Sequence, residues 1–126
     1  MKAEHDATVA KLKASWPTGR VYNVGEVPAS PTYPYLDVVV AAGDPVNYRV
    51  APQHSSLIYR AVVRSFGRNV SEVSFAAEKA DAALLNKRVA AGYAPCRREL
   101  ATSVIRDPDA GGVLMTVHTY TFTKPA

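Results

Sequence analysis

The stretch from Tyr35 to Ala41 constrains the fold of this chain most strongly, because every position except Asp37 is apolar. Its valines and its tyrosine favour an extended strand, and nearly continuous apolarity is typical of a strand covered on both faces. We therefore expect this stretch to form the most buried strand of a sheet. The preceding segment, Pro28–Pro34, holds three prolines in seven residues and predicts a rigid loop.

Residues 56–66 form a second apolar stretch, in which periodicity alone leaves helix and strand open. On either period three arginines share one side: Arg60, Arg64 and Arg68. The tyrosine, valines and phenylalanine of the stretch favour a strand. On that strand one face carries the arginines with Val62 and Phe66. The opposite face carries an apolar row of Leu57, Tyr59, Ala61 and Val63.

Clusters of glycine, proline and aspartate predict two turns. Gly43, Asp44 and Pro45 indicate a turn followed by a short partner strand over Val46–Val50. A second turn over Asp107–Gly112 separates residues 96–106 from residues 113–123. Both flanks are rich in threonine, valine and tyrosine, so the carboxyl end is predicted to be a long antiparallel hairpin.

Two segments carry the 3.6-residue period of an α-helix. Asn69 followed by Glu72 is a variant of the capping box, and it opens a helix with an apolar stripe of Val73, Ala77, Ala80 and Leu84. The other segment, Ala3–Trp16, ends before a proline and places four side chains on one face: His5, Val9, Leu12 and Trp16. We expect Trp16 to anchor this helix to the core.

Phe75 falls outside the stripe of the second helix and shares another face with Lys79 and Ala82. An exposed aromatic side chain on a helix is a candidate protein contact, and partial burial in the core stays open as the alternative.

The order of these elements predicts an α+β fold. We expect a mixed, mostly antiparallel sheet with two helices packed on one face and a C-terminal β-hairpin. A length of 126 residues suits a single domain spanning residues 1–126.

The formal net charge of +4 is distributed unevenly along the chain. Residues 45–71 contain four arginines and no carboxylate, and residues 86–106 carry five basic side chains against Glu99 alone. Such clusters face nucleic acid or an acidic protein surface, or they are solvated faces that keep a small domain soluble.

No motif in the sequence builds an active site or a metal site. Asp107 and Asp109 match the start of a calcium loop, but the twelfth position is His118 where that loop needs a glutamate. Arg97 and Arg98 would lower the pKa of the neighbouring Cys96 thiol, yet no histidine stands near it in sequence. We predict no enzyme activity, no cofactor, no metal and no small-molecule substrate.

The longest strongly apolar run, Val38–Ala42, is far too short to cross a bilayer, so no membrane association is expected. The first thirteen residues lack the apolar core of an export signal, and a single cysteine forms no internal disulfide. An intracellular, reducing compartment is predicted.

The order of segments and several local strings resemble the tail terminator family of long-tailed bacteriophages, also described as minor tail or tail-completion proteins. The resemblance covers nearly the whole chain, and Val46–Ser56 is the segment that matches no string of the family. The matching strings are a Pro34–Val40 strand, a strand running into Gly67–Asn69, a Glu72–Leu85 helix ending in Ala83–Arg88, and a hairpin with an Asp107–Asp109 turn and a Tyr120–Phe122 strand.

The resemblance implies a structural virion protein that forms a ring, typically of six copies, at the head-proximal end of the tail tube. Such a ring ends tube polymerisation and provides the docking surface for the head. The implied partners are further copies of the chain, the tail tube protein and a head-completion or neck protein. Nucleic acid would at most pass through the lumen, and the ring would assemble in the cytoplasm of the bacterial host.

A ring needs two different surfaces of one subunit to meet, and the basic clusters together with the aspartate and glutamate side chains of the second helix would supply the opposite signs. The candidate residues for the subunit or tube interface are Phe75, Lys79, Arg60, Arg64, Arg97, Arg98, Asp107 and Asp109. Three alternatives stay open. They are a head–tail connector or neck protein of the same virion, a basic nucleic-acid-binding module, and a small enzyme or ligand-binding domain that uses His54 or Cys96.

Overall fold

The chain folds into two helices and six strands within the residues that the structure describes, which are 2–16, 20–46, 56–106 and 112–124 of a computed structural model. In chain order the elements are α1 (Lys2–Ser15), β1 (Val21–Asn23), β2 (Tyr35–Val46), β3 (Ser56–Gly67), α2 (Val70–Leu84), β4 (Arg97–Ala101), β5 (Ile105–Arg106) and β6 (Leu114–Lys124). Residues 42–46 and 56 are described by their backbone alone.

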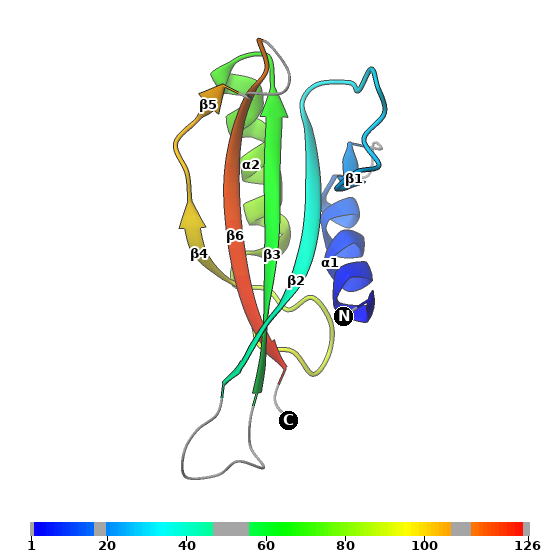
Figure 1. The fold of residues 1–126 in the computed structure, drawn as a ribbon, viewed down its shortest axis with the longest axis vertical. Coiled ribbons are helices and arrows are strands. Elements are labelled where there is room, and N and C mark those ends of the chain that lie inside the picture. Colours follow the sequence, from blue (N-terminus) through cyan, green and yellow to red (C-terminus); the bar gives the residue numbers. More distant parts are fainter. Residues whose placement is uncertain (1, 17–19, 47–55, 107–111, 125–126) are drawn as a thin grey trace.

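The six strands form one sheet in the order β1-β2-β3-β6-β4, with β5 also paired to β6 (Figure 1). The β1–β2 pair is parallel and all other pairs are antiparallel, which confirms the predicted mixed, mostly antiparallel sheet. The predicted C-terminal hairpin is also present. Its first arm is divided into β4 and β5, and between them the Thr102 amide donates to the Val117 carbonyl at 2.9 Å.

Strand β2 does not end where a turn was predicted. It continues through Gly43, Asp44 and Pro45 and stays paired with β3 as far as Val46, so the prediction of a turn there was wrong. A shift of register between Ala42 and Pro45 accommodates the proline, which has no amide proton to donate to the ladder. The rest of the predicted partner strand, residues 47–50, lies outside the described residues.

The apolar stretch that opens β2 is covered on both faces over only part of its length. Tyr35, Leu36, Asp37 and Val38 are all buried, but Val39 is 39% exposed. The prediction that both faces of the strand are covered was therefore correct only at its amino-terminal end. Beyond Val38 the strand alternates between a buried and an exposed face.

Both helices pack on one face of the sheet, as predicted. Figure 1 shows α2 behind β3 and β6, with α1 at the β2 side. The largest core lies between the two layers and includes Leu12, Trp16, Val38, Val40, Ala61, Val63, Ala76, Ala80, Leu84, Tyr120 and Phe122. The small side chains of the α2 stripe let this helix approach the sheet closely.

The predicted capping box begins α2. The Asn69 side-chain oxygen accepts from the Glu72 amide at 2.9 Å, and the Glu72 carboxylate accepts from the Arg68 amide at 2.7 Å. One amide of the first turn and the amide of the residue before the N-cap therefore have partners, which fixes the start of the helix at the end of β3.

The buried face of α1 differs from the predicted one. Leu12 is buried as expected, but the residues one and two turns before it are Thr8 and Glu4, while His5 and Val9 are only half-buried. The two polar side chains have hydrogen bonds that compensate for their burial: the Thr8 hydroxyl donates to the Glu4 carbonyl at 2.8 Å, and the Glu4 carboxylate accepts from the Tyr93 hydroxyl.

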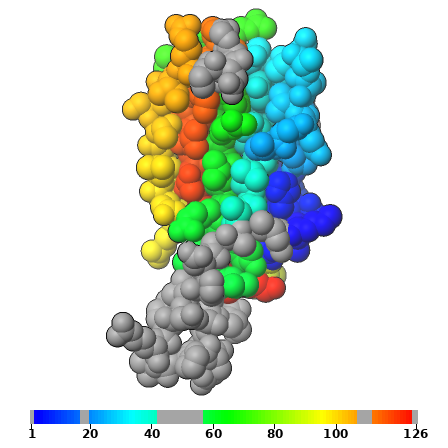
Figure 2. All heavy atoms as spheres, in the orientation of Figure 1, coloured from blue at the N-terminus to red at the C-terminus, as the bar shows by residue number. Residues whose placement is uncertain are grey.

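No described helix covers the opposite face of the sheet. Figure 2 shows β4, β6, β3 and β2 side by side on the surface of this face. A small aromatic cluster closes one end of it, where the rings of Tyr35 and Phe66 stack at 4.7 Å beside Met115. The remainder, with the exposed Val39, is an open surface built on a rigid sheet.

The close approach of Gly67 to α2 yields a first prediction. A Cβ atom at this glycine would lie 2.6 Å from the Glu72 Cβ and 2.9 Å from the Val73 nitrogen. Gly67→Ala should therefore reduce the free energy of unfolding by about 1–3 kcal/mol, measured by urea denaturation. Ser74→Ala, at an exposed position of the same helix, is the control. Equal midpoints for wild type and Gly67→Ala would contradict the contact.

Candidate assembly interface

Two of the predicted interface arginines lie in one row across the sheet. Arg60 on β3 and Arg97 on β4 are both register partners of Thr121 on β6, one on each side of it. Neighbouring strands are about 4.8 Å apart, so the two backbone positions are separated by about 10 Å. The fold thus brings together two cations that are 37 positions apart in the sequence.

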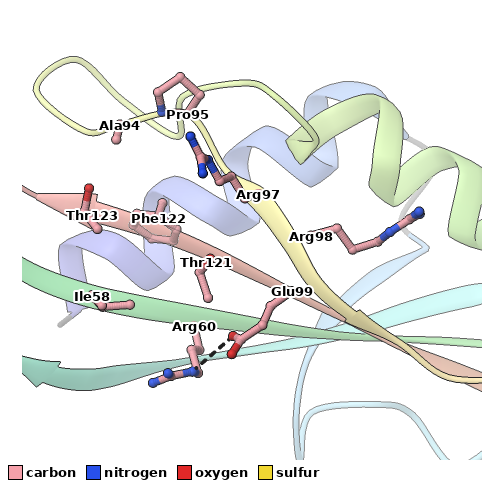
Figure 3. Close-up of a pocket in the computed structure, with 10 residues that line it drawn as sticks. All are labelled: Ile58, Arg60, Ala94, Pro95, Arg97, Arg98, Glu99, Thr121, Phe122 and Thr123. Atoms are coloured by element: carbon pink, nitrogen blue, oxygen red, sulfur yellow. Dashed lines mark hydrogen bonds and ion pairs between the residues drawn. The ribbon is translucent and has the colours of Figure 1, made fainter.

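A groove of about 530 Å³ surrounds this row (Figure 3). Its walls come from the uncovered sheet face and from the loop before β4, and its lining consists of Ile58, Arg60, Ala94, Pro95, Arg97, Arg98, Glu99, Thr121, Phe122 and Thr123. Guanidinium groups, threonine side chains and apolar surface therefore meet in one concave site.

Ion pairs hold two of the three groove arginines. The Arg60 Nε lies 3.3 Å from the Glu99 carboxylate, as the dashed line in Figure 3 shows. The Arg98 side chain extends away from that pair, and its Nη1 lies 3.0 Å from the Asp81 carboxylate of α2. Arg97 is exposed and makes no ion pair within the described part of the chain.

Arg64 is held by a buried carboxylate one strand away. Its guanidinium donates twice to Asp37, with 2.8 Å between Nε and Oδ1, and it lies 5.2 Å from the centre of the Phe66 ring. The Asp37 side chain is only 2% exposed. Because removing one partner of such a pair leaves a buried charge uncompensated, Arg64 stabilises the β2–β3 pairing.

Phe75 is partly buried, as one of its two predicted alternatives has it, and partly exposed. The residue is 46% exposed, its ring packs edge-on against Trp16 at 5.7 Å, and the Lys79 ammonium lies 5.2 Å from the ring centre. Trp16 itself is buried, which confirms its prediction as the anchor of α1. The exposed part of Phe75 leaves a small apolar patch on the helix layer.

A polar cluster around Asp81 was missed at the level of the sequence. The Asp81 carboxylate accepts from the Tyr120 hydroxyl, pairs with Arg98, and lies 3.5 Å from the His118 Nδ1. Burial, followed by the hydrogen bond to Asp81, raises the pKa of Tyr120, and burial lowers the pKa of His118. Asp81 stands one helical turn after the buried Ala77, and this spacing is the signal that places it at the edge of the stripe.

Cys96 does not have the lowered pKa that its arginine neighbours suggested. The side chain is fully buried in the core, and burial raises the pKa of its thiol to about 11. Arg97 and Arg98 extend to the surface and do not compensate for the loss of water around the sulfur. The thiol therefore lacks the exposure and thiolate character of a nucleophile.

Three sequence-predicted residues, His54, Asp107 and Asp109, lie outside the described residues. Within the described ranges no group of three or more histidine, cysteine, aspartate or glutamate side chains is placed to hold a metal ion. No helix among these residues has the length and apolarity needed to cross a membrane.

The chain shares its fold with one chain of a solved virion particle. The match is to a chain from the virion of a native gene transfer agent particle, with a TM-score of 0.66 and 15% sequence identity, over 91% of this chain and 84% of the other. No protein-family model matches the sequence, and no curated protein matches it either.

The Asp81 cluster predicts that removal of the Tyr120 hydroxyl destabilises the fold. Tyr120→Phe removes a buried donor and leaves the carboxylate with Arg98 and His118. We expect the free energy of unfolding to fall by about 1–2 kcal/mol in urea denaturation. Tyr22→Phe, at a half-buried position of β1, is the control. A Tyr120→Phe protein as stable as wild type would show that the cluster contributes nothing to folding.

The lowered pKa of His118 predicts that the free energy of unfolding falls as the pH is lowered. Its pKa lies below the ordinary 6.5 in the folded state, so the unfolded chain binds the proton more readily. Its contribution to stability is therefore lost as the pH falls below about 6.5. The drop in unfolding free energy between pH 7 and about pH 5 should be smaller in His118→Gln than in wild type. Identical drops in the two proteins would contradict this assignment.

The Cys96 environment predicts an inert thiol. At neutral pH the folded protein should resist iodoacetamide, and the unfolded chain should react at the rate of a free thiol. Ser103→Cys adds an exposed thiol as the positive control. Mass spectrometry of the alkylated chains gives the result, and rapid labelling of Cys96 in the native state would contradict its burial.

Proposed function

We propose that this protein is a structural component of a virion, and more specifically a tail terminator whose copies form a ring at the head-proximal end of a tail tube. The observation that carries the proposal is the fold shared with a chain of a gene transfer agent virion over 91% of the present chain. The finer assignment to the terminator, and the typical ring of six, rests on the sequence resemblance to the tail terminator family.

The surface of the molecule suits assembly with other proteins. On the described residues the sheet ends at β4, whose outer edge has no strand beside it. Leu100, Val104 and Ile105 lie along this edge and are 56%, 37% and 48% exposed. Apolar side chains on an unpaired sheet edge, next to an arginine-lined groove, are typical of a protein interface.

The charge distribution favours a protein partner over nucleic acid. Nucleic-acid binding depends on several free cations that displace counterions from phosphates. Here carboxylates of the same molecule hold Arg60, Arg64 and Arg98, so the strands offer fewer free charges than the sequence suggests. A non-enzymatic role agrees with this proposal, since the candidate nucleophile Cys96 is buried within the core.

The mass of the particle in solution tests this function. Size-exclusion chromatography with light scattering, run over a range of concentrations in low and high salt, should reveal a discrete species of about six times 13.6 kDa. Negative-stain images of that fraction should show closed rings. A monomer at every concentration up to about 1 mM, in either salt, would contradict self-assembly. A steeply salt-dependent complex with DNA would support the nucleic-acid alternative instead.

A further inference from the structure

The uncovered face of the sheet carries an apolar row next to an arginine that lacks an ion pair. Register pairing places one residue from each of four strands in this row: Val39, Val62, Thr119 and Leu100. Its two ends, on β2 and β4, are 39% and 56% exposed. Arg97 stands in the neighbouring row, and among the described strand residues of this face it is the cation without an ion pair. A partner that fits this face therefore brings an apolar group and a carboxylate.

The exposed side of α2 carries both of these groups. Residues that recur at the three- and four-residue spacing of one helix face form an exposed stripe: Ser71, Ser74, Phe75, Glu78 and Ala82. The Phe75 residue is 46% exposed although its ring also packs against Trp16. An aromatic ring and a carboxylate thus stand one helical turn apart on the side of α2 that faces away from the sheet.

Glu78 differs from the other carboxylates whose side chains the structure describes, because those already have partners. The buried Glu4 and Asp37 bind Tyr93 and Arg64. The partners of the remaining ones are Lys2 for Asp6, Asn23 for Glu26, the Arg68 amide for Glu72, Arg98 for Asp81 and Arg60 for Glu99. Within the described residues Glu78 is therefore the carboxylate that is still available to an outside cation.

The two surfaces also match in spacing. On a helix, residues three positions apart have Cβ atoms about 5–6 Å apart. On a sheet, rows that are two residues apart along a strand are separated by about 7 Å. A ring at Phe75 that lies on the apolar row therefore leaves the Glu78 carboxylate within reach of the Arg97 guanidinium in the neighbouring row.

We propose that the uncovered sheet face of one copy binds the exposed side of α2 of a second copy, with Glu78 paired to Arg97 and Phe75 packed on the apolar row. This contact rests on the proposed ring. It cannot form within one chain, because α2 packs on the opposite face of the same sheet (Figure 1). It joins two different surfaces, which is the heterologous geometry that closes into a ring when successive copies are rotated against one another.

Charge reversal on each side of the contact tests it. Arg97→Glu and Glu78→Lys should each weaken self-association about tenfold or more in sedimentation velocity, because like charges then meet. Melting temperatures should stay unchanged, since both side chains are exposed. An equimolar mixture of the two variants should recover most of the lost affinity, because contacts between unlike copies again join opposite charges. Arg106→Glu and Glu26→Lys, at exposed positions outside both surfaces, are the matched controls and should associate like wild type.

Cross-linking keeps the test decisive for a weak contact. A mixture of Arg97→Cys and Glu78→Cys proteins, treated with a short bis-maleimide, should give a covalent dimer of about twice 13.6 kDa. The same treatment of Arg106→Cys with Glu78→Cys should not. The native Cys96 does not compete for the reagent, because its side chain is buried.

The outcomes separate the contact from the ring. Rings that persist in both reversal variants, with no cross-link above the control, would overturn the contact and leave the ring intact. Open stacks of copies that both variants weaken and the mixture restores would support the contact and overturn the closed ring. Absence of both self-association and cross-linking would overturn the contact and the ring together.

Discussion

Strand β3 has hydrogen-bonded partners along both of its edges, and this double pairing fixes the position of the groove. Its residues pair with β2 on one side and with β6 on the other, and the alternation of side chains then separates two faces. Ala61 and Val63 enter the core beneath the helices, while Arg60 and Arg64 stand on the uncovered face. A slip of one residue would bury the arginines and expose the core, so the hydrophobic pattern strongly specifies the register.

Local chemistry explains which parts of the fold could be predicted from the sequence. The Asn69 and Glu72 pair acts within one helical turn, and the two-residue alternation of β3 is a property of a single strand, so both were found correctly. The prediction failed where pairing overrides local preference. Gly43–Pro45 is typical of a turn, yet the ladder with β3 continues through it because a shift of register accommodates the proline.

The candidate site was less predictable, because its character depends on contacts between distant segments. Its arginines were identified, but their partners Glu99, Asp37 and Asp81 come from other elements. Within the described part of the chain these partners determine which groove arginine has no ion pair. Tertiary packing likewise reversed the expected effect on Cys96, since burial outweighs the neighbouring arginines. The fold thus converts a diffuse basic charge into ordered ion pairs and one exposed arginine beside a groove.

The symmetry of the assembled particle tests the central claim most directly, namely that the chain is a virion subunit that joins its copies through two different surfaces. Single-particle electron microscopy of the associated fraction should give a closed ring with rotational symmetry, in which the groove at Arg97 of each copy contacts the next copy. A dimer with two-fold symmetry, in which the same surface meets itself, would contradict the account, as would a particle whose copies leave that groove open to solvent.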